Sequence, residues 1–271
     1  MSERIAFIGG GNMASAIIGG LIKQGRPAAS IEVVEPHAEA RQALKDKFGI
    51  IAHERAGDFL KGVSLVVWAT KPQTLKEATQ PVRAHVTGAL HLSVAAGIPS
   101  SSIARWLGSE RIVRSMPNTP ALVGLGMTGL YARGGVTAQD RTLIESVTAT
   151  MGESLWVERE EQLDAVTALS GSGPAYVFYF LEAMTQAGTE MGLSAQQAYK
   201  LAVETFRGAS ALAKASSESP EVLRQRVTSK GGTTYAAITS MDESKVKALF
   251  GKALHAAERR ARELGVEFGK D

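Results

Sequence analysis

Short apolar runs alternate, through the first half of the chain, with stretches in which apolar residues recur every three or four positions. This alternation is typical of strands followed by amphipathic helices in an α/β fold. The longest apolar run, residues 63–69, is typical of a parallel strand that is covered on both faces. Further strands are expected at residues 5–8, 31–34, 50–51, 90–95, 127–131 and 154–157. The pattern predicts an α/β fold with a doubly wound, mostly parallel sheet.

From residue 161 onward the strand-like runs cease and only helical periodicity remains. Long helices are expected at residues 175–191, 195–214, 220–227 and 234–264. A chain of 271 residues exceeds the usual size of a single hydrophobic core, so two domains are expected. We place an α/β domain at residues 1–160 and an all-α domain at residues 161–271.

A glycine-rich turn follows the first strand, where Gly9-x-Gly11-x-x-Ala14 matches the dinucleotide-binding fingerprint in its Ala-ending form. Gly9 permits the tight turn, Gly11 leaves room for a pyrophosphate near the backbone, and Ala14 lets the helix pack close to the strand. The helix that follows has one apolar face, and its N-terminus offers unpaired N–H groups and a partial positive charge. The turn therefore predicts binding of a dinucleotide cofactor.

Later strand ends add candidate cofactor contacts. Glu35 follows the second strand, about 20 residues beyond the fingerprint, where dinucleotide-binding folds place an acidic residue that accepts ribose hydroxyls. A carboxylate there repels a 2′-phosphate and so favours NADH, although Arg41 could still reach a phosphate. Residues 70–72 and 95–97 also follow strands, and loops at the carboxyl ends of parallel strands face the ligand crevice. We expect both loops to form walls of the cofactor site.

Two stretches break the helical pattern of the second half, Ser-Gly-Ser-Gly-Pro at residues 170–174 and Gly-Gly-Thr-Thr at residues 231–234. Glycines leave backbone N–H groups accessible, and hydroxyls add donors without a permanent charge, so a small anion such as a substrate carboxylate fits there. Taken separately, each stretch also fits a helix kink or an N-cap. Two such stretches in one domain favour a site for a small anionic substrate.

Composition removes several kinds of chemistry. The chain contains no cysteine, which excludes disulfides and thiolate nucleophiles or ligands, and its five histidines lack ligand spacing, so no metal site is expected. The net charge is +3, from 30 basic and 27 acidic residues that are mostly scattered, so no nucleic-acid partner is expected. The start of the chain lacks signal-peptide architecture, and no apolar run is long enough to span a bilayer. A cytoplasmic enzyme with no membrane partner is therefore expected.

Six motifs, in the order in which they occur, closely resemble those of pyrroline-5-carboxylate reductases. They are Phe7-Ile8-Gly9-Gly10-Gly11-Asn12-Met13, Lys71-Pro72, Ala95-Ala96-Gly97, Met116-Pro117-Asn118-Thr119-Pro120-Ala121, Ser170-Gly171-Ser172-Gly173-Pro174-Ala175-Tyr176 and Gly231-Gly232-Thr233-Thr234. The resemblance covers essentially the whole chain, and the last two strings are much more specific than the glycine fingerprint. Members of this family reduce 1-pyrroline-5-carboxylate to L-proline with NADPH or NADH, in the last step of proline biosynthesis.

The resemblance implies a Rossmann domain followed by an all-helical substrate and dimerisation domain. In such a homo-oligomer the C-terminal helices of two subunits interlock, and the active site is assembled between chains. By motif match, Thr234 points at the imine nitrogen and is the catalytic residue. Together with Glu35, the cofactor-binding residues are Gly9, Gly11, Asn12, Met13, Ala69, Thr70, Lys71, Pro72, Ala96 and Gly97. The substrate-binding residues are Asn118, Ser172, Ser229, Gly231, Gly232, Thr233 and Thr234.

Two positions depart from the family pattern. Lys230 stands where members commonly carry proline, which adds a positive charge beside the carboxylate site and loosens the turn. Ala56 stands where some members place an asparagine near the adenosine ribose, which puts a contact there in doubt. Neither departure removes a chemical group that the reaction needs.

Imine reduction needs little acid–base equipment, because the cofactor supplies the hydride while the imine nitrogen gains a proton. The Ser, Thr and Gly stretches of the second domain suit that chemistry. β-Hydroxyacid dehydrogenases share the domain plan but use a lysine soon after a glycine-rich helix opening, whereas residues 174–180 contain none. A non-catalytic dinucleotide-sensing protein is the alternative from another class, and it predicts cofactor binding without turnover. The sequence leaves open the preference between NADH and NADPH, the number of subunits beyond a dimer, and the tolerance for other cyclic imines.

Overall fold

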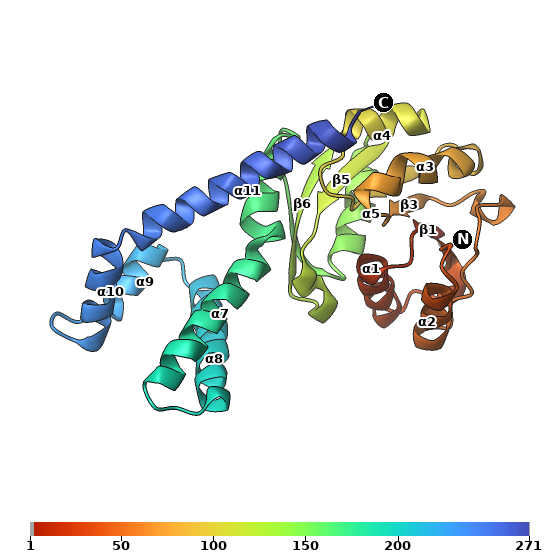
Figure 1. Ribbon diagram of the computed structural model, residues 1–271. Helices are drawn as coiled ribbons and strands as arrows, with labels where there is room; N and C mark the ends of the chain where they lie inside the picture. Colours follow the sequence, from red (N-terminus) through yellow and green to blue (C-terminus); the bar gives the residue numbers. More distant parts are fainter. Residues whose placement is uncertain (1–2, 271) are drawn as a thin grey trace. The chain divides into compact units, whose positions relative to one another are not determined.

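The computed structural model describes residues 3–270, which form two compact units. The first unit comprises the described residues up to Gly173 together with those from Ala257 onward. The second unit is Pro174–Ala256. Figure 1 labels the helices and strands of both units.

The first unit is built on one seven-stranded sheet with the order β2-β1-β3-β4-β5-β6-β7. Strands β1 to β5 are parallel, β6 is antiparallel to β5, and β7 is parallel to β6. The strands are β1 (Ile5–Ile8), β2 (Ile31–Val34), β3 (Leu65–Trp68), β4 (Leu90–Ser93), β5 (Ile112–Met116), β6 (Gly126–Ala132) and β7 (Gly152–Trp156). The expected α/β class with a doubly wound, mostly parallel sheet is confirmed.

Helices cover both faces of this sheet (Figure 1). Helices α1, α2 and α5 pack on one face, and α3 and α4 pack on the other. The α-helices of the first unit are α1 (Asn12–Lys23), α2 (Ala38–Phe48), α3 (Pro72–Val82), α4 (Ser100–Leu107), α5 (Ala138–Thr148) and α6 (Gln162–Val166), and the end of α11 (Val246–Phe268) joins them. Short helical turns are η1 (Ala28–Ser30), η2 (Asp58–Leu60), η3 (Arg83–His85), η4 (Thr119–Val123) and the π-helical η5 (Thr167–Gly171).

The central strands β1 and β3 are apolar throughout because both of their faces are buried. Along β1, Phe7 packs in the core beneath α1, whereas Ile8 packs in the core beneath α3, as period-two alternation requires. All four residues of β3 are buried, so the longest apolar run of the sequence lies inside the sheet as expected. The carboxyl ends of these central strands are thereby held at one edge of a rigid, water-free layer.

The second unit is helical. It contains α7 (Gly173–Glu190), α8 (Ala195–Ala215), α9 (Pro220–Arg226), α10 (Thr233–Glu243) and the beginning of α11. Ser194 starts α8 with a capping box to Gln197. Phe250 makes edge-on aromatic contacts with Tyr176 and with Phe180. None of the helices among residues 3–270 is long and apolar enough to cross a membrane.

Two sequence expectations about elements were wrong. Residues 234–264 do not form one helix, because the chain breaks between α10 and α11, where Lys245 takes a left-handed conformation with φ of 55°. Residues 50–51 do not form a strand, although Ile50 is buried in the core and an isolated bridge joins Val34 to His53 nearby. The division at residue 160, which separates β7 from the helices after it, stays a prediction.

Candidate active site

The glycine turn after β1 has a shape that other residues cannot take. Gly9 has φ of 99°, and a Cβ there would lie 2.5 Å from the carbonyl oxygen of Ala69. Its N–H donates to the carbonyl of Val34 at 2.8 Å, which fixes the turn to the neighbouring strand β2. Gly9 therefore allows β1, β2 and β3 to meet closely at their carboxyl ends.

The start of α1 is open to a ligand. Gly11 is its N-cap, no side chain caps the helix, and no heavy atom lies within 4 Å of where a Cβ at Gly11 would stand. The first-turn N–H groups, including those of Asn12 and Met13, have no carbonyl partner within the helix itself. Uncovered amides beside an empty approach path have the chemistry to hold a diphosphate. The geometry of this turn thus fits a dinucleotide.

Glu35 plays a role that the sequence did not indicate. The residue is only 6% exposed, and its Oε2 accepts the Gly10 N–H at 2.7 Å while Oε1 accepts the His37 N–H at 2.8 Å. The carboxylate therefore anchors the glycine turn to the end of β2. It also borders the cavity described next, so its negative charge remains beside the space where a ribose would lie.

A cavity of about 710 Å³ lies at the carboxyl ends of β1, β2 and β3. The strand order places β1 between β2 and β3, so the cavity occupies the point where successive connections leave in opposite directions, which is the usual ligand crevice of such sheets. Six of the expected cofactor-binding residues line it together: Gly9, Gly11, Glu35, Ala69, Thr70 and Lys71. Thr70 adds a buried hydroxyl oxygen that has no hydrogen-bond partner within the described part of the chain.

Sequence reasoning missed other walls of this cavity. His37, Arg55 and Glu77 also line it, and Ala56, one of the departures from the family pattern, does so as well. His37 comes shortly after β2, so position after a strand was the signal that could have identified it, whereas Arg55 and Glu77 follow no strand.

The remaining expected cofactor residues lie beside this cavity or away from it. Pro72 begins α3 directly after Lys71, which suits a residue that lacks an N–H. Ala96 and Gly97 lie in the loop after β4, and neither lines the cavity at β1 to β3. Gly97, with φ of 78°, instead borders a second cavity of about 530 Å³ together with residues of α4 and the end of α11.

Both polar atoms of the Asn118 side-chain amide form hydrogen bonds within the protein. Its Nδ2 donates to the carbonyl of Ser170 at 3.0 Å, and its Oδ1 accepts the N–H of Met127 at 2.9 Å. Asn118 thus ties the segment after β5 to the π-helix η5. The Ser172 N–H donates to the carbonyl of Thr167 at 2.8 Å, which continues that π-helical turn into α7.

The second open helix start belongs to the second unit. Gly231 has φ of 76°, the Gly232 N–H donates to the Ser229 carbonyl at 3.0 Å, and Gly232 caps α10 without any side-chain hydrogen bond. Thr233 and Thr234 then supply hydroxyls in the first turn. Free amides and neutral hydroxyls at the start of an 11-residue helix can bind a carboxylate. Lys230 is exposed beside this turn.

The acidic and histidine side chains of residues 3–270 include one buried histidine, His91. Among residues 3–270 no group of three or more His, Asp or Glu side chains could hold a metal ion. The buried His91 accepts a hydrogen bond from Trp68 Nε1 at 3.3 Å, and burial lowers its pKa to about 4. His91 is therefore a neutral core residue in β4.

Comparisons with known proteins agree along the whole chain. Residues 160–264 match the family model for pyrroline-5-carboxylate reductase dimerisation, and residues 4–97 match the model for NADP oxidoreductase, coenzyme F420-dependent. Pyrroline-5-carboxylate reductase of Pseudomonas aeruginosa is 45% identical over 271 residues, with 99% of each chain covered.

Two solved structures are similar over nearly their full length. The pyrroline-5-carboxylate reductase of Coxiella burnetii is 38% identical with a TM-score of 0.91, covering 97% of this chain and 99% of that one. The pyrroline carboxylate reductase of Plasmodium falciparum, solved with NADP bound, is 25% identical with a TM-score of 0.85, covering 97% and 98%.

Proposed function

The chain belongs to the pyrroline-5-carboxylate reductase family, and on that premise we propose how it reduces 1-pyrroline-5-carboxylate to L-proline with NADH or NADPH. It is an oxidoreductase of proline biosynthesis. When bound, the reduced nicotinamide supplies the hydride that the imine carbon accepts, and the ring nitrogen gains a proton. The protein has to bind two anionic groups, orient two rings and donate a hydrogen bond.

One observation carries the proposal: α1 and α10 both begin after a glycine turn and are both left without a side-chain cap. The start of α1 binds the cofactor diphosphate, because Gly11 leaves its backbone uncovered. The start of α10 binds the substrate carboxylate through Ser229, through the amide of Gly231 and through Thr233, while Gly232, whose N–H donates to the Ser229 carbonyl, shapes the turn. Each anion thus meets the partial positive charge of a helix N-terminus.

Thr234 is the catalytic residue of the proposal. Its hydroxyl stands one residue inside α10 and donates a hydrogen bond to the imine nitrogen while the ring carboxylate is held by the preceding turn. Orientation of this kind reduces the entropy cost of bringing the two carbons together. Neutral hydroxyl donors suffice, which accords with the absence of histidine, aspartate and glutamate from residues 229–234.

Two alternative functions differ from this proposal in what they require of the chain. A β-hydroxyacid dehydrogenase is not favoured, because relatives over the full chain are pyrroline-5-carboxylate reductases and residues 174–180 contain no lysine. A dinucleotide-binding protein without turnover predicts that no substrate would accelerate oxidation of the cofactor.

The cofactor is a nicotinamide dinucleotide, and we place the preference with NADH. Glu35 keeps a buried negative charge at the cavity, and a 2′-phosphate brought beside it would be repelled at low local dielectric. Arg55 lines the same cavity but is highly exposed and pairs with Glu54 at 3.6 Å, so its charge is already partly neutralised. These contacts favour the cofactor that lacks the extra phosphate.

The experiment is a comparison of kcat/KM for NADH and NADPH with pyrroline-5-carboxylate, with a keto acid as the control substrate. We expect turnover with pyrroline-5-carboxylate only, and a ratio of roughly tenfold in favour of NADH. Glu35→Gln removes the charge but keeps an acceptor for the Gly10 N–H, and it should move the ratio towards NADPH. No turnover with the imine would overturn the proposed reaction, and a clear NADPH preference in the unmodified chain would overturn the role given to Glu35.

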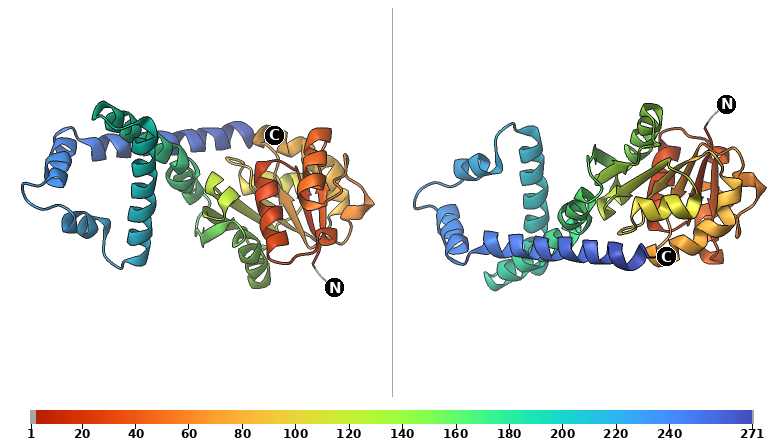
Figure 2. Two further views of the ribbon diagram at one scale, coloured as in Figure 1. Left: turned by 90° about the horizontal axis from the view of Figure 1, so that it is seen from below. Right: turned by 90° about the horizontal axis from the view of Figure 1, so that it is seen from above.

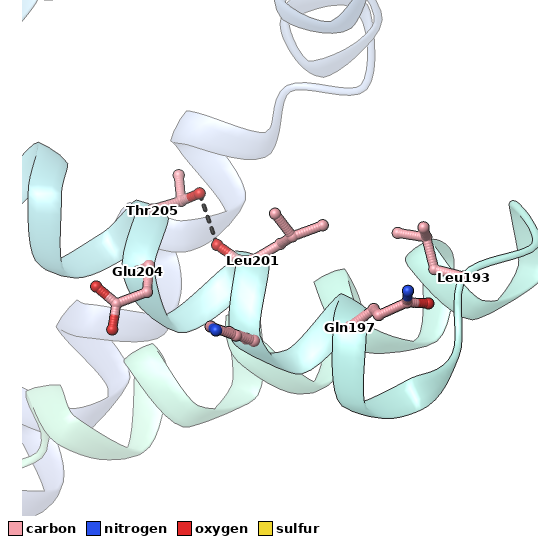
Figure 3. Close-up of a pocket in the computed structure, with 6 residues that line it drawn as sticks. Leu193, Gln197, Leu201, Glu204 and Thr205 are labelled. Carbon is pink, nitrogen blue, oxygen red and sulfur yellow. Dashed lines mark hydrogen bonds between the residues drawn. The ribbon is translucent and has the colours of Figure 1, made fainter.

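The chain forms a homo-oligomer, and we propose at least a dimer whose C-terminal helices interlock. The composition of the second unit's core supports this. Among residues 174–256, Leu181 is the one large apolar residue that is buried, whereas many other large apolar residues are exposed. Figure 3 shows one such place, a hollow of about 580 Å³ along α8 that is bordered by Leu193 and Leu201. Helices with this little internal core need a partner surface to stay folded.

A further inference from the structure

A charged side chain lies inside the sheet at β5. Arg114 follows two apolar residues of this strand, and its side chain is 11% exposed. Its Nη1 lies 2.6 Å from Oε1 of Glu160, the residue that comes shortly before α6. The two charges therefore form a largely buried pair that joins the sheet to the segment leading into α6.

The same carboxylate also caps a distant helix. Helix α4 begins after Pro99, which supplies no side-chain cap, and Glu160 takes that place from 60 residues away. Its Oε1 accepts the Ser100 N–H at 2.6 Å, and its Oε2 accepts the Ser100 hydroxyl at 2.5 Å. A carboxylate at the start of a helix is favoured by both the free N–H groups and the helix dipole.

The cap fixes the loop that joins β4 to α4. This loop carries Ala96 and Gly97, which the resemblance to the family assigns to cofactor binding. The end of α11 closes the other side, since the Gly97 carbonyl lies 3.1 Å from where a Cβ at Gly265 would stand. The Ser102 hydroxyl also donates to the carbonyl of Gly269 at 2.8 Å, and α11 ends beside α4 in Figure 1 and in both views of Figure 2.

The electrostatics keep Glu160 ionised. Burial by itself raises the pKa of this carboxyl, but the charge of Arg114 and the hydrogen bonds from Ser100 outweigh it, so the net pKa lies below its ordinary value. Buried ion pairs add little net stability, because desolvation of the charges opposes their attraction. The pair instead fixes geometry, because one carboxylate links β5, the start of α4 and the segment before α6.

We propose that Glu160, held by Arg114, is a positioning residue for hydride transfer, because its cap on α4 keeps the loop with Ala96 and Gly97 in place for the bound cofactor. The inference rests on the proposed function for the identity of the cofactor and for the role of this loop in holding it. The contacts that carry it all lie within the first unit.

Three variants test the inference. Glu160→Ala removes the cap and leaves Arg114 unpaired, whereas Glu160→Gln keeps an amide oxygen that can still accept the Ser100 N–H. Glu161→Gln is the matched control, because it removes one negative charge from the next residue, whose side chain is exposed. The measurements are kcat, the KM for pyrroline-5-carboxylate, the primary isotope effect with NADH deuterated at the transferred position, the melting temperature, and amide hydrogen exchange of the cofactor-free protein.

For Glu160→Ala we expect kcat to fall about tenfold or more, since small misplacements of reacting groups are costly, while the KM for the imine changes less than about twofold. The isotope effect should rise, and exchange over residues 94–103 should quicken by about tenfold, while residues 12–23 exchange as before. Glu160→Gln should lie between Glu160→Ala and the unmodified chain, and Glu161→Gln should match the latter.

A lower melting temperature with unchanged kcat, isotope effect and loop exchange would show that Glu160 only stabilises the fold, and would overturn the inference. If Glu160→Ala does not fold, the same criteria apply to Glu160→Gln. Failure of the proposed reaction is separately visible as absence of turnover by the unmodified chain. In that case the exchange of residues 94–103 still decides whether Glu160 holds the loop.

Discussion

Thr234 stands in the first turn of α10, after two glycines that leave the backbone open. In the proposed site, a single hydroxyl at this place would separate binding from turnover, because the carboxylate is assigned to the turn and not to this hydroxyl. The glycines and hydroxyls of this turn could be identified from the sequence, since their spacing alone indicates an anion site at a helix start.

We expect Thr234→Ala to lower kcat by roughly 100-fold, the usual effect of losing one preorganised donor, with little change in cofactor affinity. Thr234→Ser retains the hydroxyl and should recover most of the activity. Tyr235→Phe removes a hydroxyl from the next, exposed residue and serves as the control. Steady-state kinetics with fluorescence titration of NADH separate the two effects, and unchanged kcat in the alanine variant would exclude Thr234 as the donor.

The hydrogen bonds of Glu35 are an example of residue contacts that the sequence does not predict. Position after a strand predicts Glu35 as a cofactor contact, but its hydrogen bond with Gly10 joins residues that are 25 positions apart. Arg114 and Glu160 were likewise not identified, although a charged residue within an expected buried strand was a usable signal. Which residue pairs with a buried charge depends on how elements that are distant in the sequence pack together. Local sequence patterns do not predict that packing.

His91 makes the stability of the first unit depend on pH. The side chain is 2% exposed and its pKa falls from 6.5 to about 4, chiefly by burial, with Arg111 adding to the effect. The unfolded chain therefore takes up a proton below about pH 6.5 that the folded chain refuses until about pH 4, so stability falls as the pH falls through this window.

His91→Asn keeps an acceptor for the Trp68 indole N–H but cannot titrate. We expect the loss of unfolding free energy between pH 6.5 and pH 4 to shrink by up to about 3 kcal/mol in this variant. Urea denaturation across this range measures it, and His37→Asn, at an exposed position, is the control. An unaltered pH dependence in His91→Asn would show that His91 contributes nothing to it.

Strands and helices with a strong local sequence pattern were predicted correctly. A helix break that depends on the conformation of one residue was not predicted. The apolar run at residues 63–69 contains β3, and the turn after Ile8 leads into α1, because burial on both faces and the glycine spacing leave few alternatives. The break between α10 and α11 escaped notice. Lys245 is an ordinary helix former, so its local sequence does not indicate the left-handed conformation that it takes.

Lys245→Gly should therefore stabilise the protein. A lysine at φ of 55° costs about 1 kcal/mol that glycine avoids, and the greater entropy of glycine in the unfolded chain removes part of the gain. We expect a net increase of about 0.5 kcal/mol in the free energy of unfolding. The same substitution two residues later, Lys247→Gly, lies inside α11 and should destabilise by about 1 kcal/mol. Chemical denaturation at one protein concentration compares them, and destabilisation by Lys245→Gly would contradict the argument.

At the scale of the whole molecule, the second unit exposes many large apolar side chains. Leu201 on α8 is 58% exposed and borders the hollow of Figure 3, where the Thr205 hydroxyl bonds to the Leu201 carbonyl at 2.7 Å. Burial of one such leucine in an interface is worth roughly 1.5–3 kcal/mol. A dimerisation family model that matches residues 160–264 indicates that association provides the cover.

Leu201→Lys should weaken association at least about tenfold, because an apolar contact is lost and a charge must be desolvated. Sedimentation velocity over a dilution series would then show a lighter species at concentrations where the unmodified chain remains associated. Ile51→Lys is the control, as Ile51 is 75% exposed but lies in the first unit. Identical sedimentation of Leu201→Lys and the unmodified chain would place the interface elsewhere.

The return of α11 to the first unit affects the order in which the chain can fold during synthesis. Residues from Ala257 onward pack on the β4–α4 loop, and Phe268 reaches the core beneath α3 and α4. A ribosome makes the whole sheet, and then all of residues 174–256, before it makes this last segment. Until then Pro99 and its neighbours remain uncovered on the nascent chain, so the cofactor-binding unit is finished only after the helical unit has been synthesised.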